Sequence, residues 1–230
     1  MKSLFKKIFN ITKKLIILFM LLSVSLVLLM RWIDPFSSML MVERKFSDKK
    51  IIQQRTWKDW DHISDNIKIA VIAAEDQNFA NHWGFDFKAI ERALKHNQNN
   101  KKIRGASTIT QQVAKNIFLW SSRSWIRKSI ESWFTLEIEL LWSKKRTLEI
   151  YLNSVEWGNG IFGIEAASQY YFHVSAKQLT PYQASLLAAI LPNPRKWNPA
   201  KPNHYIQKKA QWIRNQMNNL GGNNYLKQLN

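Results

Sequence analysis

The stretch Ala73–Asp86, AAEDQNFANHWGFD, holds the side chains of this sequence that are best suited to acid–base chemistry. Two adjacent acids, Glu75 and Asp76, are followed closely by Asn78 and His82. A carboxylate within hydrogen-bond reach of a hydroxyl group can take its proton, and the neighbours of that carboxylate can set its pKa for the task. The acid pair is therefore a candidate general base.

The residues before this stretch predict the helix that would position the acids. Apolar residues recur at the spacing of one helix face, at Ile67, Ala70, Val71 and Ala74. Ser64 or Asp65 can cap the start of this helix. The acids then lie at its C-terminus, where the negative end of the helix dipole opposes ionisation and raises a carboxyl pKa. The alternative, which the residue types alone favour, is an acid pair on a solvated helix end.

A second candidate site lies in Gly105–Leu119, GASTITQQVAKNIFL. Thr108 and Gln111 have the spacing of a capping box, and an apolar stripe follows at Ile109, Val113 and Ile117. Hydroxyl groups and unpaired backbone N–H groups at a helix N-terminus can bind anionic oxygens. Lys115 lies on the same side, two turns along. The alternative, which the spacing alone favours, is a well-capped amphipathic helix with a solvated lysine.

A third group of charged residues lies in the predicted long helix Arg123–Trp142. Arg123, Arg127 and Glu131 share one face at i, i+4 and i+8, with Lys128 beside them. The group is either a surface ion-pair ladder, worth about 0.2–0.5 kcal/mol per pair, or a phosphate clamp with an acid at its edge. We expect Glu137 and Glu139 to be structural. The inner side of the helix is predicted to hold Ile126, Ile130, Trp133, Phe134 and Leu141.

The remaining segments also favour helices. Asp86 can cap a helix to about His96 whose inward residues would be Phe87, Ile90 and Leu94, and the polar, basic stretch 97–104 is predicted to be a mobile loop. Three more helices are predicted. One runs from Ser143 to Asn153, a second follows the glycine-containing loop SVEWGNGIFG, and a third starts at Thr180. The three glycines of that loop allow positive φ and close approach of a ligand. The tail after residue 203 is expected to be one basic helix with a frayed end. The predicted fold class is all-α.

Composition narrows the classes of function. Of 230 residues, 46% are apolar and none is cysteine, so the chain can form a substantial core and has no disulfide or thiolate chemistry. The five histidines do not have the spacing of a metal site. The net charge of +18 favours an anionic partner. Five of these charges cluster near the N-terminus, at Lys2, Lys6, Lys7, Lys13 and Lys14.

An uncharged apolar run, Leu15–Met30, follows the lysine cluster. As a helix it would span roughly 24 Å, short of the roughly 30 Å hydrocarbon core of a bilayer. Trp32 and Ile33 extend the run, and Lys14 and Arg31 can reach the interface. The run is long for the apolar region of a signal peptide, and no small-residue cleavage site follows it. We therefore expect an uncleaved membrane anchor.

The anchor sets the predicted organisation of the chain. Residues 1–14 form a basic cytoplasmic tail, 15–33 a transmembrane helix, 34–60 a juxtamembrane connection with strand-like pieces, and 61–230 the catalytic domain. Lysines before an apolar span keep the preceding segment in the cytoplasm. The expected location is the bacterial inner membrane, single-pass, with the catalytic domain in the periplasm.

Five motifs in fixed order resemble the peptidoglycan glycosyltransferase family 51, the transglycosylase domains of class A penicillin-binding proteins and their stand-alone relatives. The motifs are EDQNFANHWGFD, GASTITQQVAKNIFL, RKSIE, KRTLEIYLNSVEWGNGIFGIEAAS and LLAAILPNPRKWNP. The resemblance covers about residues 66–199. It is closest to the stand-alone, monofunctional members, since no transpeptidase domain follows in this sequence.

The resemblance implies a lysozyme-like, two-lobed, all-α domain that polymerises lipid II. It implies that Glu75 is the general base, which takes the proton of the incoming GlcNAc 4-hydroxyl, and that Glu131 is a second acid near the acceptor hydroxyl or a divalent ion. Inversion at the anomeric carbon would give a β-1,4 linkage and release undecaprenyl pyrophosphate. The substrate-binding positions implied by the family are Asp76, Asn78, His82, Ser107, Thr108, Gln111, Gln112, Lys115, Arg123, Arg127 and Lys128.

The same resemblance implies the partners. These are lipid II, the growing lipid-linked glycan and the membrane, together with division or cell-wall synthesis proteins; nucleic acid is not expected outside the cytoplasm. No tightly bound cofactor is expected, and Mg²⁺ or Mn²⁺ would assist through the pyrophosphate, with Glu131 as one candidate ligand. Two other functions stay open: a membrane-anchored, non-catalytic scaffold of the cell-wall machinery, and a lysozyme-like glycan hydrolase.

Overall fold

The computed structural model of the chain describes residues 2–47, 52–99, 105–122 and 124–229, apart from the side chains of residues 2, 3 and 99. The α-helices of this part are α1 (Lys2–Leu29), α2 (Met39–Ser47), α3 (Asp65–Glu75), α4 (Phe87–Asn99), α5 (Ile109–Phe118), α6 (Trp125–Leu141), α7 (Lys144–Ser154), α8 (Ile164–Phe172), α9 (Pro181–Ile190) and α10 (His204–Asn219). The predicted all-α class is confirmed.

Short strands and 3₁₀ turns join the helices. The strands β1 (Gln54–Arg55), β2 (Glu156–Gly158) and β3 (Ile161–Phe162) form a small sheet in the order β1-β3-β2, parallel between β1 and β3 and antiparallel between β2 and β3. The 3₁₀ turns are η1 (Trp60–His62), η2 (Phe79–Asn81), η3 (Ala176–Gln178) and η4 (Gly222–Leu229).

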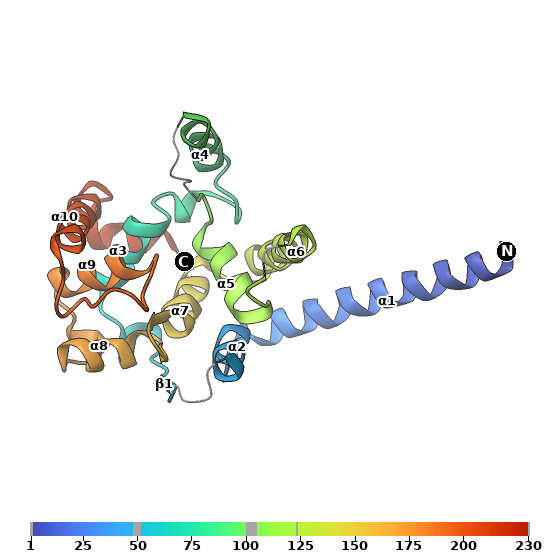
Figure 1. Cartoon of the computed structure of the whole chain (residues 1–230), viewed down its shortest axis with the longest axis horizontal. Coiled ribbons are helices and arrows are strands. Elements are labelled where there is room, and N and C mark those ends of the chain that lie inside the picture. Colours follow the sequence, from blue (N-terminus) through green and yellow to red (C-terminus); the bar gives the residue numbers. More distant parts are fainter. Residues whose placement is uncertain (1, 48–51, 100–104, 123, 230) are drawn as a thin grey trace.

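Two groups of packed helices form the main body of the protein. In one group α3 packs against α9 and α10, and in the other α5 packs against α6 and α7 (Figure 1). The predicted capping residue Ser64 starts α3, where its Oγ accepts a hydrogen bond from Asn66 N at 3.2 Å. Every residue of 67–73 is buried, so α3 is enclosed on all sides and not on one face. The acids at its end therefore emerge from the core.

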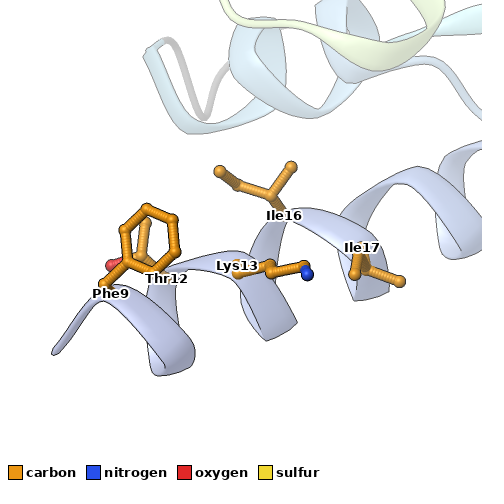
Figure 2. Close-up of a pocket in the computed structure, with 5 residues that line it drawn as sticks. All are labelled: Phe9, Thr12, Lys13, Ile16 and Ile17. Carbon is orange, nitrogen blue, oxygen red and sulfur yellow. The ribbon is translucent and has the colours of Figure 1, made fainter. Parts of the chain in front are cut away.

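Helix α1 extends away from the two groups (Figure 1). It begins within the predicted basic tail and ends at Leu29, four residues before the predicted end of the span. Its segment Leu4–Leu29 is long and apolar enough to cross a membrane. An open pocket on this helix is lined by Phe9, Thr12, Lys13, Ile16 and Ile17 (Figure 2). Because it lies on the extended part of α1, it is not the candidate active site.

Helix α4 begins as predicted but faces differently. Ala89 N donates to Asp86 Oδ1 at 2.8 Å, which confirms the cap. Phe87 and Leu94, predicted to face inward, are 76% and 59% exposed, whereas Ala93 is buried. Figure 1 shows α4 projecting from the body, where it has little surface to pack against. Most of the loop predicted at 97–104 lies outside the described residues, and 97–99 continue α4.

The glycine-containing segment after α7 forms a hairpin whose strands are buried. Strands β2 and β3 are buried at every position. Gly163 has a φ of 79°, and a Cβ there would lie 2.9 Å from the carbonyl oxygen of Asn153. The close approach that glycine permits is therefore to the chain's own backbone.

The segment predicted as a juxtamembrane connection contains a helix that the sequence analysis did not predict, α2. Ser38 caps it, with Oγ accepting from Met41 N at 3.2 Å. Arg44 pairs with the buried Glu156 at 3.0 Å. The guanidinium of Arg55 donates to the carbonyl oxygen of Asn153 on α7 and to the carbonyl oxygens of Pro35 and Phe36 within the segment. These long-range contacts hold the segment against the main body.

The C-terminal end is also ordered, where a frayed end was expected. Turn η4 buries Tyr225 and Leu229. The hydroxyl of Tyr225 accepts from Ala80 N at 3.0 Å and lies 3.2 Å from the carbonyl oxygen of Gln77. The end of the chain thus supports the backbone that follows the two acids.

Candidate active site

Glu75 closes α3, and its carboxylate is held by a chain of side chains from two other helices. Gln112 Nε2 of α5 donates to Glu75 Oε2 at 2.9 Å, and Tyr151 OH of α7 lies 3.2 Å from Gln112 Oε1. Tyr151 is 1% exposed. Because Tyr151 donates to Oε1, it fixes which end of the Gln112 amide points at Glu75.

The environment of Glu75 favours a carboxyl group that can exchange a proton. Burial raises its pKa above the ordinary value, and the adjacent charge of Asp76 also raises it. The hydrogen bond from Gln112 and the charges of Lys209 and Lys115 act in the opposite direction. The predicted rise is confirmed in direction, but its main cause is desolvation and not the helix dipole.

Asp76 has a different task from its neighbour. Its oxygens lie 2.9 and 3.0 Å from His82 Nε2, and Oδ2 also accepts from the backbone N–H of Ile109 at 3.0 Å. Ile109 is the first residue of α5, so Asp76 joins the end of α3 to the positive end of the α5 dipole. Both Asp76 and His82 are buried. Asp76 therefore positions Glu75 relative to α5.

The N-terminus of α5 is closed by the predicted capping box. Thr108 Oγ1 accepts from Gln111 N, and Gln111 Oε1 accepts from Thr108 N. Thr108 also donates to the carbonyl oxygen of Gly84 at 2.6 Å. Both side chains are thus engaged inside the protein, whereas Ser107 is exposed and Asn78 is half-buried. Of these four implied substrate-binding residues, Ser107 and Asn78 keep side chains open to a ligand.

The charged residues of α6 form an ion-pair cluster around a buried acid, Glu131. Arg127 Nη1 lies 2.6 Å from Glu131 Oε2, and Lys128 Nζ contacts Glu131 Oε1. Glu131 is 3% exposed, so this is more than the solvated ladder that was one of the two alternatives. Arg123, the fourth predicted member, lies outside the described residues. Ile126, predicted to face inward on this helix, is 73% exposed.

Lys115 interacts electrostatically with both acids, Glu75 and Glu131. Burial lowers its pKa, and the charges of Glu131 and Glu75 raise it again. The charges of Arg127 and Lys128 also act on Lys115 and lower its pKa. One lysine thus senses both carboxylates and both cations of α6. The structure therefore brings Glu75, Lys115, Arg127, Lys128 and Glu131 into a single site.

The residues of this site do not fit a directly bound divalent ion. Both oxygens of Glu131, the candidate ligand, are already paired with cations. Within the described ranges, no three His, Cys, Asp or Glu side chains lie together in a way that could hold a metal. The other two acids of α6 are structural, as predicted: Glu137 contacts Ser23, and Glu139 contacts Thr110 and Lys144.

Lys209 is a site residue that the sequence analysis missed. It lies on α10, which packs against α3, and its Nζ donates to the carbonyl oxygen of Ala189 at 3.1 Å. Burial lowers the pKa of Lys209, and the charge of Glu75 raises it. The sequence showed that this helix is basic, but nothing local connected it to Glu75.

Replacing Gly84 by Ala is expected to destabilise the protein by about 2–4 kcal/mol, because Gly84 adopts a left-handed φ of 76° and a Cβ there would lie 2.6 Å from Thr135 Cγ2. Chemical denaturation of both proteins measures this difference. Gly105→Ala is the matched control, since nothing lies within 4 Å of a Cβ at Gly105. Equal stability of the Gly84 and Gly105 variants would contradict the prediction.

Comparison with known proteins finds similarity over most of the chain. A family model described as transglycosylase matches residues 43–218. Three proteins named biosynthetic peptidoglycan transglycosylase are similar to this chain over 94% of its length. The one from Ectopseudomonas mendocina is 56% identical over 220 residues, 94% of this chain and 91% of that protein. The one from Pseudomonas fluorescens is 57% identical over 221 residues, 94% and 92% of the two chains. The one from Stutzerimonas stutzeri is 55% identical over 220 residues, 94% and 91% of the two chains.

Proposed function

This chain belongs to the transglycosylase family and is a peptidoglycan glycosyltransferase, and from that premise we propose how its site extends a glycan strand. The growing lipid-linked glycan is the donor, and the GlcNAc 4-hydroxyl of lipid II is the acceptor. One observation carries this proposal. A partly buried carboxylate with a raised pKa, Glu75, shares the lysine Lys115 with the cation cluster of α6.

The base in this reaction is Glu75. Its carboxylate takes the proton of the acceptor 4-hydroxyl while the acceptor oxygen attacks the anomeric carbon of the donor. The bond from that carbon to the pyrophosphate oxygen breaks, and the pyrophosphate leaves with the electron pair. Attack opposite the leaving group inverts the anomeric carbon and gives a β-1,4 linkage. Gln112 fixes the carboxylate during this step through its bond to Oε2.

The cations serve the leaving group, on which negative charge grows as the bond breaks. Preorganised charges aimed at that position stabilise the transition state more than the ground state. Lys115, Arg127 and Lys128 are the described cations available for this role. Glu131 holds Arg127 and Lys128 in place and offsets part of their mutual repulsion. A hydrolase that releases a neutral sugar hydroxyl has less need of such a cluster.

A divalent ion would enter this reaction with the pyrophosphate and not through Glu131. We expect EDTA to slow polymerisation and added Mg²⁺ or Mn²⁺ to restore the rate, because the ion neutralises phosphate charge. The measurement is the initial rate in EDTA against the rate after each metal is added back. Full activity in EDTA would remove the metal from the proposal.

The N-terminal helix suggests a membrane anchor, and we propose that the N-terminus is cytoplasmic and the catalytic domain periplasmic. Donor and acceptor both carry polyprenyl chains, so an anchored enzyme meets them within one leaflet. The chain has no cysteine, so single cysteines can report topology. A cysteine at Lys201 should react with an impermeant reagent on spheroplasts, whereas one at Lys6 should not. The reverse labelling would overturn this topology.

The proposed activity is tested with purified protein and labelled lipid II. Glycan that grows with time and is digested to disaccharide units by a muramidase is the expected product. No product under varied detergent and metal conditions would leave a scaffold of the cell-wall machinery as the better account. Shortening of preformed glycan without lipid II would instead identify a hydrolase.

Replacing Lys209 by Met is expected to move the acid limb of the pH–rate profile to higher pH. The charge of Lys209 lowers the pKa of Glu75, and a general base works only when ionised. Without that charge, Glu75 ionises at higher pH. The measurement is kcat/KM against pH for the wild type and the variant.

The control for this shift is the adjacent exposed lysine, Lys208. Lys208→Met removes the same charge from the surface and should leave the acid limb in place. A Lys209→Met profile that superimposes on that of the wild type would show that Lys209 does not tune Glu75.

A further inference from the structure

The C-terminal part of the anchor helix is docked on the catalytic domain. Most side chains of α1 are exposed, but Ser23 and Val27, one turn apart, are 4% and 0% exposed. Helix α1 packs against α6. Trp142 Nε1 donates to the carbonyl oxygen of Val27 at 2.7 Å, and Phe19 packs edge-on against Phe134. The anchor is therefore more than a flexible tether.

A polar cluster lies at the centre of this contact. Ser23 Oγ lies 2.7 Å from Glu137 Oε1 and 3.0 Å from the carbonyl oxygen of Met20, and it accepts from Trp133 Nε1 at 3.0 Å. Glu137 is 5% exposed, so its carboxyl group is out of water. A serine inside an apolar helix normally satisfies its hydroxyl on its own backbone. Here α6 supplies two further partners.

The cluster is consistent with a neutral carboxyl group on Glu137. Burial raises the pKa of this group, and its second oxygen, Oε2, is buried without a hydrogen-bond partner. A protonated Glu137 can donate to Ser23 Oγ, which leaves the single hydroxyl proton of Ser23 for the carbonyl oxygen of Met20. Ser23 can then form both hydrogen bonds, with Met20 and with Glu137, while Glu137 carries no charge.

The chain that leaves the anchor is tied down as well. The guanidinium of Arg146, on α7, donates to the carbonyl oxygens of Met30 and Ile33 and pairs with Asp34 at 2.8 Å. A fourth contact joins Arg146 to Glu149 at 2.7 Å. The first residues after α1 thus have a fixed path onto the domain.

Helix α6 lies between this contact and the active site. Glu137 is six residues from Glu131, which places the two side chains about 120° apart around the helix. One side of α6 therefore carries Arg127 and Glu131 toward the site, and another carries Trp133 and Glu137 toward the anchor. A change in how the anchor meets α6 changes where the site stands relative to the bilayer.

We propose that Ser23 is a positioning residue for glycan polymerisation, which acts through Glu137 and Trp133 to hold α6 at a fixed orientation to the membrane-spanning helix. The partner it serves is the lipid-linked substrate, whose pyrophosphate lies at the bilayer surface while its chain stays in the hydrocarbon. A domain that rotates freely on its anchor is in the orientation that can bind lipid II for only a fraction of the time. The apparent affinity for lipid II is then reduced in proportion to that fraction. This inference rests on the proposed function.

The orientation is measured by distances between two spin labels in liposomes. Labels at Leu15→Cys on α1 and Lys201→Cys on the domain use exposed positions in a chain without cysteine. The otherwise unchanged chain should give one narrow distance distribution. Ser23→Ala and Glu137→Ala should broaden it, whereas Glu137→Gln, which can still donate to Ser23 Oγ, should keep it narrow. Ser25→Ala, an exposed serine on the same helix, is the matched control.

The kinetic consequence separates positioning from general damage to the fold. In liposomes, Ser23→Ala should raise KM for lipid II about tenfold, the size expected from weakening a small hydrogen-bond cluster, and leave kcat unchanged. In detergent micelles, where substrate approaches from any direction, its KM should match that of the wild type. Glu137→Gln should keep the liposome KM within about twofold of the wild-type value.

Two results would overturn the proposal. One is a narrow distance distribution in Ser23→Ala and Glu137→Ala that matches the wild type. The other is a loss of kcat by Ser23→Ala that is equal in micelles and liposomes, which would show damage to the domain itself. The distance measurement does not require activity, so an inactive wild type would count against the proposed function and leave the orientation result standing.

Discussion

Glu75→Gln is expected to lower the rate of lipid II polymerisation by about 10³-fold, within the range that general-base catalysis contributes. Glutamine keeps the size of the side chain, and its amide oxygen can still accept from Gln112 Nε2, which lies 2.9 Å from Glu75 Oε2. The change therefore removes the basic lone pair and leaves the surroundings in place. Initial rates of glycan formation at saturating lipid II measure the loss.

The stability of this variant gives an independent check, with a sign set by the raised pKa of Glu75. An acid whose pKa is higher in the folded than in the unfolded state favours folding below the unfolded pKa. That contribution is lost as pH rises through the folded pKa. Above the folded pKa, the ionised Glu75 thus destabilises the fold, and Gln removes this penalty. The thermal midpoint of Glu75→Gln should equal or exceed that of the wild type.

A surface acid provides the comparison for both measurements. Glu91 pairs with Lys95 on the exposed face of α4, and Glu91→Gln makes the same chemical change away from the site. Its polymerisation rate should match that of the wild type. A Glu75→Gln enzyme with at least a tenth of the wild-type rate would show that another group takes the acceptor proton.

Short-range sequence patterns predicted most helix starts correctly. Ser64, Thr108, Ser143 and Thr180 each cap the predicted helix, because a capping side chain bonds a backbone N–H two or three residues away. The same locality explains why Glu75 was correctly placed at the end of α3. Capping interactions involve only residues that are close in sequence, so tertiary packing rarely changes where a helix starts.

Apolar periodicity predicted which helix faces are apolar, but not whether another element packs against each face. Phe87 and Ile126 share the helical spacing of buried residues but are 76% and 73% exposed, because spacing carries no information on whether a partner element lies opposite. Helix α2 was missed for a related reason. It is nine residues long with Met41 buried, and its arginine contacts Glu156, more than a hundred residues away. Only the folded chain shows these contacts.

In the candidate active site, too, contacts within one helix could be predicted from the sequence, whereas contacts between distant helices could not. The ion pairs of Glu131 with Arg127 and Lys128 follow from helical spacing and could be predicted within one helix. The effect of Lys209 on Glu75 depends on the packing of α10 against α3, which no local pattern encodes. The raised pKa of Glu75 was predicted from the helix end, but its main cause, burial, depends on the helices that surround it.

Lys115→Met is expected to lower kcat/KM by about 10²–10³-fold, because this lysine is the described cation whose charge acts on both acids of the site. Burial lowers the pKa of Lys115, yet the nearby carboxylates of Glu131 and Glu75 favour its charged form. An ammonium that interacts electrostatically with both the base and the α6 cluster is suited to the charge that grows on the pyrophosphate. Removing an interaction made mainly in the transition state should lower kcat and kcat/KM alike.

The measurement must separate this loss from a change in the base. Lys115 also lowers the pKa of Glu75, so the variant is compared with the wild type on the alkaline plateau, where Glu75 is ionised in both. Lys88→Met, which removes an exposed charge from α4, should leave the rate unchanged. A Lys115→Met enzyme that keeps the wild-type plateau rate would show that the cations do not act on the leaving group. The chemistry would then resemble the release of a neutral sugar more than that of a pyrophosphate.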